Sequence, residues 1–85
     1  MGVAKSGRFE EQLAQLGAGL ERLDEAISFA EEQLTNHPAS GIPTAVPGIY
    51  SFPTRLPTGN GLAHVSIFYL YDGKDVRFID LKRSP

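Results

Sequence analysis

The side chains best suited to chemistry are a histidine and three arginines in the second half of this 85-residue chain: Arg55, His64, Arg77 and Arg83. Histidine changes its charge near neutral pH, which makes His64 the candidate general acid or base. Arginine stays charged and binds anions through a planar set of N–H donors. These residue types suit the binding of a polyanion, with a proton transfer close to it.

Charge is divided unevenly between the two halves of the chain. Residues 1–41 contain three basic and seven acidic side chains, a net charge of −4, whereas residues 42–85 contain five basic and three acidic ones, a net charge of +2. A polyanionic partner would therefore meet the second half. Dedicated nucleic-acid-binding proteins are usually far more basic than this chain, so its charge favours only a local basic surface.

Several other chemistries find no support in the sequence. The chain has no cysteine, which excludes disulfides and thiolate metal sites. Its two histidines have no carboxylates clustered around them and there is no glycine-rich phosphate loop, so we expect neither a metal nor a cofactor. Ser66 lacks the nearby histidine and aspartate that a hydrolase nucleophile needs. No apolar run approaches the roughly 20 residues that span a bilayer, and we expect a cytoplasmic protein without membrane contact.

The elements that would position these residues begin with a helical stripe. Apolar residues are spaced 4-3-4-3-4-3-4 at Phe9, Leu13, Leu16, Leu20, Leu23, Ile27, Ala30 and Leu34. One helix of about 28 residues could pair with a partner as a coiled coil. Alternatively, Gly17-Ala18-Gly19 divides the stripe into an αα-hairpin, because each glycine costs a helix interior about 1 kcal/mol. We favour the hairpin, with Ser6 as the N-cap of its first helix and residues 36–38 ending its second.

The rest of the chain predicts a loop and three strands. Residues 38–48 are rich in proline and glycine and read as a loop, and residues 48–56 form a strand that Pro53 confines to a sheet edge. A turn at 57–61 leads to the clearest strand, 62–71, and Asp72-Gly73 predicts a two-residue type I′ turn before a last strand at 76–82. The predicted fold is α+β: a single domain, residues 1–85, with the αα-hairpin packed on a three-stranded antiparallel meander.

A two-residue turn fixes which side chains share a face of this sheet. It places Tyr69 opposite Val76 and Ile67 opposite Phe78, on the face that packs against the helices. The other face would then carry His64, Ser66, Arg77 and Arg83. We therefore expect the working surface on the side of the sheet away from the helices.

The order of elements resembles the RelE/ParE superfamily, the toxins of type II toxin–antitoxin systems. Three segments carry the resemblance: Phe9-x3-Leu13-x2-Leu16, Leu34-Thr-Asn-His-Pro38-x2-Gly41, and the run from Val65 to Ile79 through Tyr69-Leu-Tyr71-Asp-Gly. Members normally open with a strand that pairs with the sheet. Here only residues 1–5 precede the first helix, so that strand is very short or missing.

What the resemblance implies is a growth-inhibiting toxin that acts as a RelE-like, ribosome-dependent mRNA endonuclease and is neutralised by a cognate antitoxin. The reaction is attack of a ribose 2′-hydroxyl on the adjacent phosphate, which needs a base, cations and an acid. Carried onto this chain, Arg55 is the basic residue of the first meander strand, His64 begins the central strand, and Arg83 is the basic residue near the C-terminus. Arg77 joins them as a further cation of the same face.

A second class remains open beside the enzyme. The same fold serves non-catalytic protein-interaction modules, among them ParE-like inhibitors of gyrase and degenerate members of the family. In either class the antitoxin is expected to cover the groove beside the sheet with an extended or helical segment. A long-helix coiled-coil protein is the third alternative.

Overall fold

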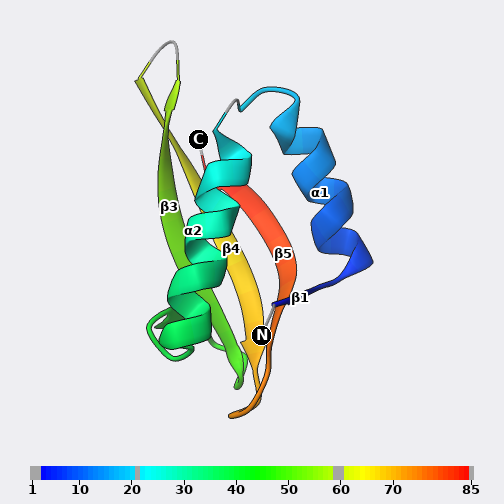
Figure 1. Cartoon of the computed structure of the whole chain (residues 1–85), viewed down its shortest axis with the longest axis vertical. Coiled ribbons are helices and arrows are strands. Elements are labelled where there is room, and N and C mark those ends of the chain that lie inside the picture. Colours follow the sequence, from blue (N-terminus) through cyan, green and yellow to red (C-terminus); the bar gives the residue numbers. More distant parts are fainter. Residues whose placement is uncertain (1–2, 21, 59–60, 85) are drawn as a thin grey trace.

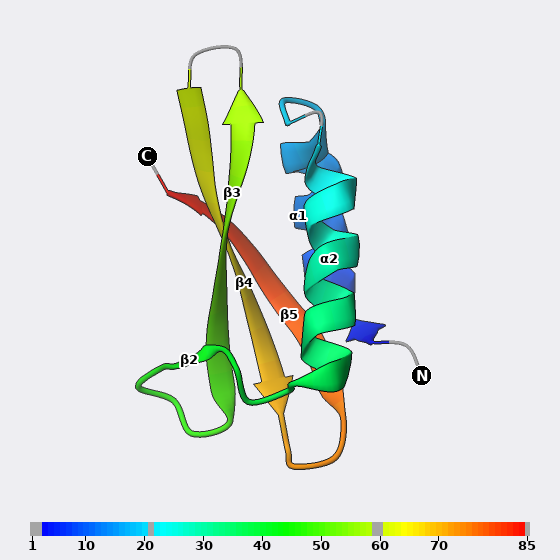
Figure 2. The same cartoon turned by 60° about the vertical axis from the view of Figure 1, so that its left-hand side comes forward.

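The computed structural model describes residues 3–20, 22–58 and 61–84. Two helices, α1 (Gly7–Gly17) and α2 (Leu23–Asn36), lie on one side of a five-stranded sheet (Figures 1 and 2). The strands are β1 (Ala4–Lys5), β2 (Ile42–Pro43), β3 (Ile49–Thr58), β4 (Gly61–Tyr71) and β5 (Val76–Ser84), in the spatial order β1-β5-β4-β3-β2. The α+β class is confirmed.

The prediction of a three-stranded sheet is wrong, because a short strand is added at each edge. β1 runs parallel to β5 and β2 runs antiparallel to β3, and each has only two residues. Segments this short have no visible alternation of apolar and polar residues, which is the signal for a strand in a sequence. The 38–48 loop therefore contains a strand that its composition did not indicate.

The helical stripe is divided into two helices, and one continuous helix is wrong. Ser6 caps α1 as predicted, since its Oγ accepts a hydrogen bond from the Phe9 N–H at 3.1 Å. α1 ends at Gly17, and neither Gly17 nor Gly19 has a positive φ. The division therefore reflects the low helix propensity of glycine rather than a left-handed turn. Between the helices, Leu20 is buried in the core.

α1 also covers the outer edge of β5. The Ser6 N–H donates to the Phe78 carbonyl at 2.9 Å, and the Ser6 hydroxyl donates to the Ile79 carbonyl at 3.2 Å. One turn further along α1, the Gln12 side-chain oxygen accepts from the Leu81 N–H at 2.8 Å. Backbone groups that β1 is too short to pair are satisfied in this way, so this edge is closed to other strands.

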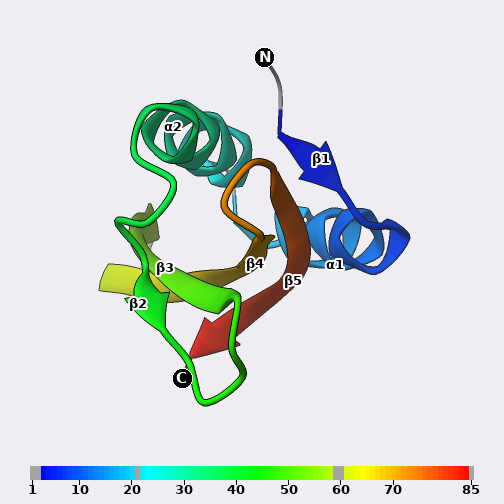
Figure 3. The same ribbon diagram turned by 90° about the horizontal axis from the view of Figure 1, so that it is seen from below.

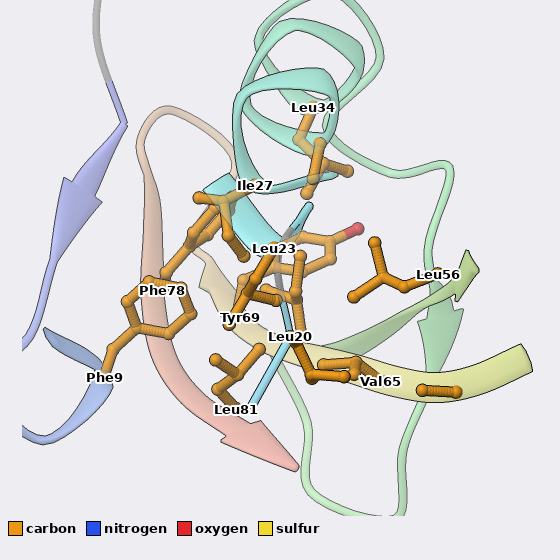
Figure 4. Packing of buried hydrophobic residues seen from close by; sticks show 13 residues of the cluster. Phe9, Leu20, Leu23, Ile27, Leu34, Leu56, Val65, Tyr69, Phe78 and Leu81 are labelled. Carbon is orange, nitrogen blue, oxygen red and sulfur yellow. The ribbon is translucent and has the colours of Figure 1, made fainter. Parts of the chain in front are cut away.

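The core lies between the helices and the sheet (Figure 3), where thirteen apolar residues of the described part of the chain form one buried cluster (Figure 4). Phe9 from α1 and Phe78 from β5 meet at its centre with their ring centroids 5.2 Å apart, and both side chains are inaccessible to solvent. Tyr69 lies beside them on β4, stacked on Tyr50 of β3. As predicted, Tyr69 lies on the face that packs against the helices, and it belongs to the buried core.

The β4–β5 hairpin is closed by four residues, not two. Tyr71 pairs with Val76, and the Asp72 carboxylate accepts hydrogen bonds from the N–H groups of Asp75 at 2.8 Å and Lys74 at 2.9 Å. Those two bonds hold the pKa of Asp72 below its ordinary value. The predicted type I′ turn at Asp72-Gly73 is wrong because this carboxylate organises a longer turn around itself.

A β-bulge at Ile79 changes the register a second time. Tyr69 pairs with Phe78, but the preceding residue, Phe68, pairs with Asp80, so one residue of β5 is extra. Phe78 and Leu81 are both buried although they are three residues apart. Strict alternation would bury only one of them, and the extra residue allows both to face the helices. From Asp80 onward, every side chain of β5 lies on the face opposite to the predicted one.

The Tyr69 hydroxyl fastens the segment between α2 and β2 to the sheet. It donates to the Pro38 carbonyl at 2.7 Å and accepts from the Gly41 N–H at 3.0 Å. A Cβ atom at position 41 would collide with this hydroxyl, which explains the glycine. Burial raises the pKa of Tyr69 above its ordinary value. The hydrogen bond from the Gly41 N–H lowers this pKa by a smaller amount, and Tyr50 raises it slightly further.

Replacing Tyr69 by phenylalanine should lower the free energy of unfolding by about 1–3 kcal/mol, since it leaves two partly buried backbone groups without their partner. Wild-type stability should also fall as the pH rises through the raised pKa of Tyr69, because the unfolded chain releases that proton first. The variant lacks this contribution. Urea denaturation at neutral pH and at about pH 10.5 measures both effects. Tyr71→Phe, on the same strand and face, is the matched control, and equal losses in the two variants would contradict a role for the Tyr69 hydroxyl.

Candidate functional site on the open face of the sheet

The face of the sheet turned away from α1 and α2, here called the open face, carries the candidate site (Figure 2). The burial pattern of β4 defines it, because Ala63, Val65, Ile67 and Tyr69 are buried against the helices while the residues between them are exposed or half-buried. Strand register then assigns each neighbouring side chain to one of the two faces.

Arg55 and His64 lie directly opposite each other on this face, on β3 and β4. Both are exposed to solvent. Pro53 and Pro57 have no N–H to donate, so each occupies a position of β3 whose backbone does not bond to β4. Arg55 lies between them at the same spacing of two, so its backbone also points away from β4. Such non-hydrogen-bonded pairs have their Cα atoms only about 4.5 Å apart. The structure therefore brings together two of the predicted site residues.

Lys82 is the third member of the group, and reasoning from the sequence missed it. The bulge at Ile79 places Lys82 opposite Ser66, on the open face and one diagonal step from His64, a separation of about 7–8 Å. Arg55, His64 and Lys82 are called the cationic cluster below. The signal that could have found Lys82 is the spacing of three between Phe78 and Leu81, since two core residues at odd spacing in one strand indicate a bulge.

The other two predicted site residues lie apart from this cluster. Arg83 pairs with Val65, so the bulge turns it to the face of the helices, and its predicted place beside His64 is wrong. Arg77 is on the open face, opposite Leu70. Leu70 is six positions from His64 along β4, so Arg77 lies about 20 Å from His64. Neither arginine is positioned to share a small ligand with His64.

The charges of the cationic cluster are not neutralised within the described part of the chain. Ion pairs there join Lys5 to Glu31, Arg8 to Asp80 at 3.6 Å and Arg22 to Glu25 at 3.4 Å, and none includes Arg55 or Lys82. Among the described residues there is also no group of histidine and acidic side chains that could hold a metal ion. The cluster is therefore suited to an anion, with an imidazole between two cations.

A second feature meets the open face at Arg55. A groove of about 430 Å³ runs between α2 and the part of β3 that lies beyond β2, and we call it the α2–β3 groove. Its lining is largely apolar and includes Phe29, Phe52 and Leu56, with Arg22, Glu25 and Arg55 among its polar members. Phe29 is 56% exposed and lies among the lining residues of the groove. This groove lies beside the sheet, between β3 and α2.

Comparison of the chain with protein-family models, with curated proteins and with solved structures gives no match. Within residues 3–20, 22–58 and 61–84, no helix is long and apolar enough to cross a membrane.

Proposed function

We propose that this chain is a toxin of the RelE/ParE type that cleaves mRNA on the ribosome and is neutralised by a cognate antitoxin. The observation that carries the proposal is the direct opposition of Arg55 and His64 on the solvent-exposed face, with Lys82 one diagonal step away. The arrangement of the elements also supports this family, since two helices pack on the meander of β3, β4 and β5 and β1 lies beside β5.

The cationic cluster has the parts that this reaction needs. The 2′-oxygen of one ribose attacks the adjacent phosphorus, and the bond from phosphorus to the 5′-oxygen breaks, which leaves a 2′,3′-cyclic phosphate and a 5′-hydroxyl. His64 would act as the base that takes the proton of the 2′-hydroxyl, and solvent water would protonate the departing 5′-oxygen. Arg55 beside His64 would stabilise the extra negative charge on the phosphate in the transition state, and Lys82 would add a second cation.

The direct test is expression and cleavage. Expressed without an antitoxin, the wild-type protein should slow bacterial growth, and the pure protein should cut a reporter mRNA within codons in a translating extract, as read by primer extension. Uncut message together with normal growth would contradict a toxin of either class.

A second candidate function is a non-catalytic toxin that inhibits a protein target, of which the gyrase-directed members of the family are the example. The α2–β3 groove favours it, because an apolar groove with an exposed aromatic residue is typical of a surface that binds another protein. The same experiment separates the two functions, since growth arrest with uncut message would assign the protein to this class. In both classes we propose that the antitoxin occupies this groove.

A further inference from the structure

We infer that the open face binds single-stranded RNA with Phe68 as a stacking platform for one base, while Lys82 holds the phosphate on the His64 side of that base. This inference deepens the proposed function and takes RNA as the ligand from it. It adds an aromatic subsite to the cationic cluster and a direction in which the strand runs across the sheet.

Phe68 is the only aromatic residue that the register assigns to the open face among the described residues. The other aromatic side chains of β3, β4 and β5 have the opposite parity and face the helices. The ring pairs in the described structure join Phe9 to Phe78 and Tyr50 to both Tyr69 and Tyr71, so Phe68 takes part in none of them. The half-buried ring is thus free for a planar ligand.

Small side chains flank the half-buried Phe68 toward β3 and toward His64, while Leu70, 40% exposed, follows it on the same face of β4. Ser51 lies opposite on β3, and Ser66 precedes it on the same face of β4. Both are small, so a base can approach the ring, and their hydroxyl groups can bond to its edge. A partly exposed aromatic side chain beside small polar residues on a sheet is a common way to hold an unstacked base.

Lys82 connects this subsite to the cationic cluster. It lies opposite Ser66, which is midway between His64 and Phe68 on the open face of β4, so it is one diagonal step from each of them. From Phe68 to His64 the strand rises about 14 Å. A phosphate at Lys82 would therefore lie between a base stacked on Phe68 and a ribose–phosphate unit at His64.

Asp80 sets the path of the strand. It pairs with Phe68 on β5, and its carboxylate lies 3.6 Å from the Arg8 Nε and accepts the Leu81 N–H. Asp80 therefore offers no cation to a phosphate at the level of Phe68, whereas Lys82, one diagonal step away, does. The first phosphate is accordingly placed toward Lys82 and the base at the level of Phe68. Bases inside a duplex are not accessible to such a platform, so the ligand must be single-stranded.

The test measures binding without cleavage. A fluorescein-labelled, fully 2′-O-methylated single-stranded RNA of about ten nucleotides has no free 2′-hydroxyl, so it can bind but cannot be cut. Its affinity for the full chain is measured by fluorescence anisotropy over a range of salt concentrations. We expect Phe68→Leu to weaken binding roughly ten-fold and Phe68→Trp to retain it, because stacking needs a π-face rather than apolar volume.

The matched pair for the phosphate contact is Lys82→Gln and Arg83→Gln, adjacent residues on opposite faces of β5. Lys82→Gln should weaken binding and reduce the slope of log affinity against log salt by about one, whereas Arg83→Gln should leave the slope unchanged. Urea denaturation of each variant identifies any loss that comes from unfolding.

Three results would overturn the inference: no binding by the wild type at low salt, equal affinities for wild type and Phe68→Leu, or equal losses for Phe68→Leu and Phe68→Trp in folded protein. Failure of the proposed function looks different. Binding that follows the expected pattern, with unmodified mRNA left uncut in the extract, would support the platform and contradict the catalysis. Cleavage that depends on His64 but not on Phe68 would support the catalysis and contradict the platform.

Discussion

Replacing Phe78 by alanine should lower the free energy of unfolding by about 3–5 kcal/mol. The ring is inaccessible to solvent and meets Phe9 at a centroid distance of 5.2 Å, and it pairs with Tyr69 across β4 and β5. Truncation removes apolar contacts and leaves a cavity where both helices and the sheet converge. Because small domains are stable by only about 5–15 kcal/mol, the variant should be close to unfolding.

Phe29→Ala is the control for this prediction, since it makes the same truncation at a side chain that is 56% exposed. It should change the free energy of unfolding by no more than about 0.5 kcal/mol. Urea denaturation followed by circular dichroism compares the two variants at equal protein concentration. If both lose the same stability, the exposed position of Phe29 and the central position of Phe78 are contradicted together.

Removing either member of the Arg55–His64 pair should lower the rate of mRNA cleavage by about 100-fold or more. Arg55→Ala removes a cation beside the phosphate, a loss on the order of 3 kcal/mol in transition-state stabilisation. In the proposed reaction His64→Ala removes the base, and we expect an effect of similar size. Both residues are exposed on the sheet, so neither substitution disturbs the core.

The rate is measured as the appearance of primer-extension stops on a reporter mRNA over time in a translating extract. Arg83→Ala provides the control, since the bulge turns Arg83 to the face of the helices. Its cleavage rate should stay within a few-fold of the wild type. A large loss with Arg83→Ala, and none with Arg55→Ala in folded protein, would place the reacting phosphate elsewhere.

The helices and the three long strands could be predicted from the sequence because each has a strong local signal. The apolar stripe, the Ser6 cap and the alternation along residues 62–71 act over neighbouring residues, and the structure follows them. β2 could not be predicted, since a two-residue strand exists only through its partner, and the resemblance left β1 open only as a very short or missing strand. The same holds for the edge of β5, which α1 covers through Ser6 and Gln12.

The candidate site was predicted only in part, because faces of a sheet depend on register and register depends on distant packing. Arg55 and His64 were placed correctly on the open face, as their strands are joined without a shift. Lys82 and Arg83 lie on the faces opposite to the predicted ones, because burying both Phe78 and Leu81 requires an extra residue at Ile79. The four-residue turn alone would have preserved the predicted faces, since it shifts the pairing by an even number of residues.

The bulge at Ile79 also bears on how such a surface tolerates a change of strand register. If β5 paired with β4 without the bulge, the faces of all residues from Asp80 onward would be reversed, and a surface that depended on a single cation would lose it. Here the two basic residues are consecutive, Lys82 and Arg83. Whichever of the two registers the strand adopts, one of them is displayed beside Ser66 and His64 and the other is withdrawn. Two consecutive basic residues therefore keep a positive charge on this face in either register, whereas a single basic residue would be lost from it in one of them.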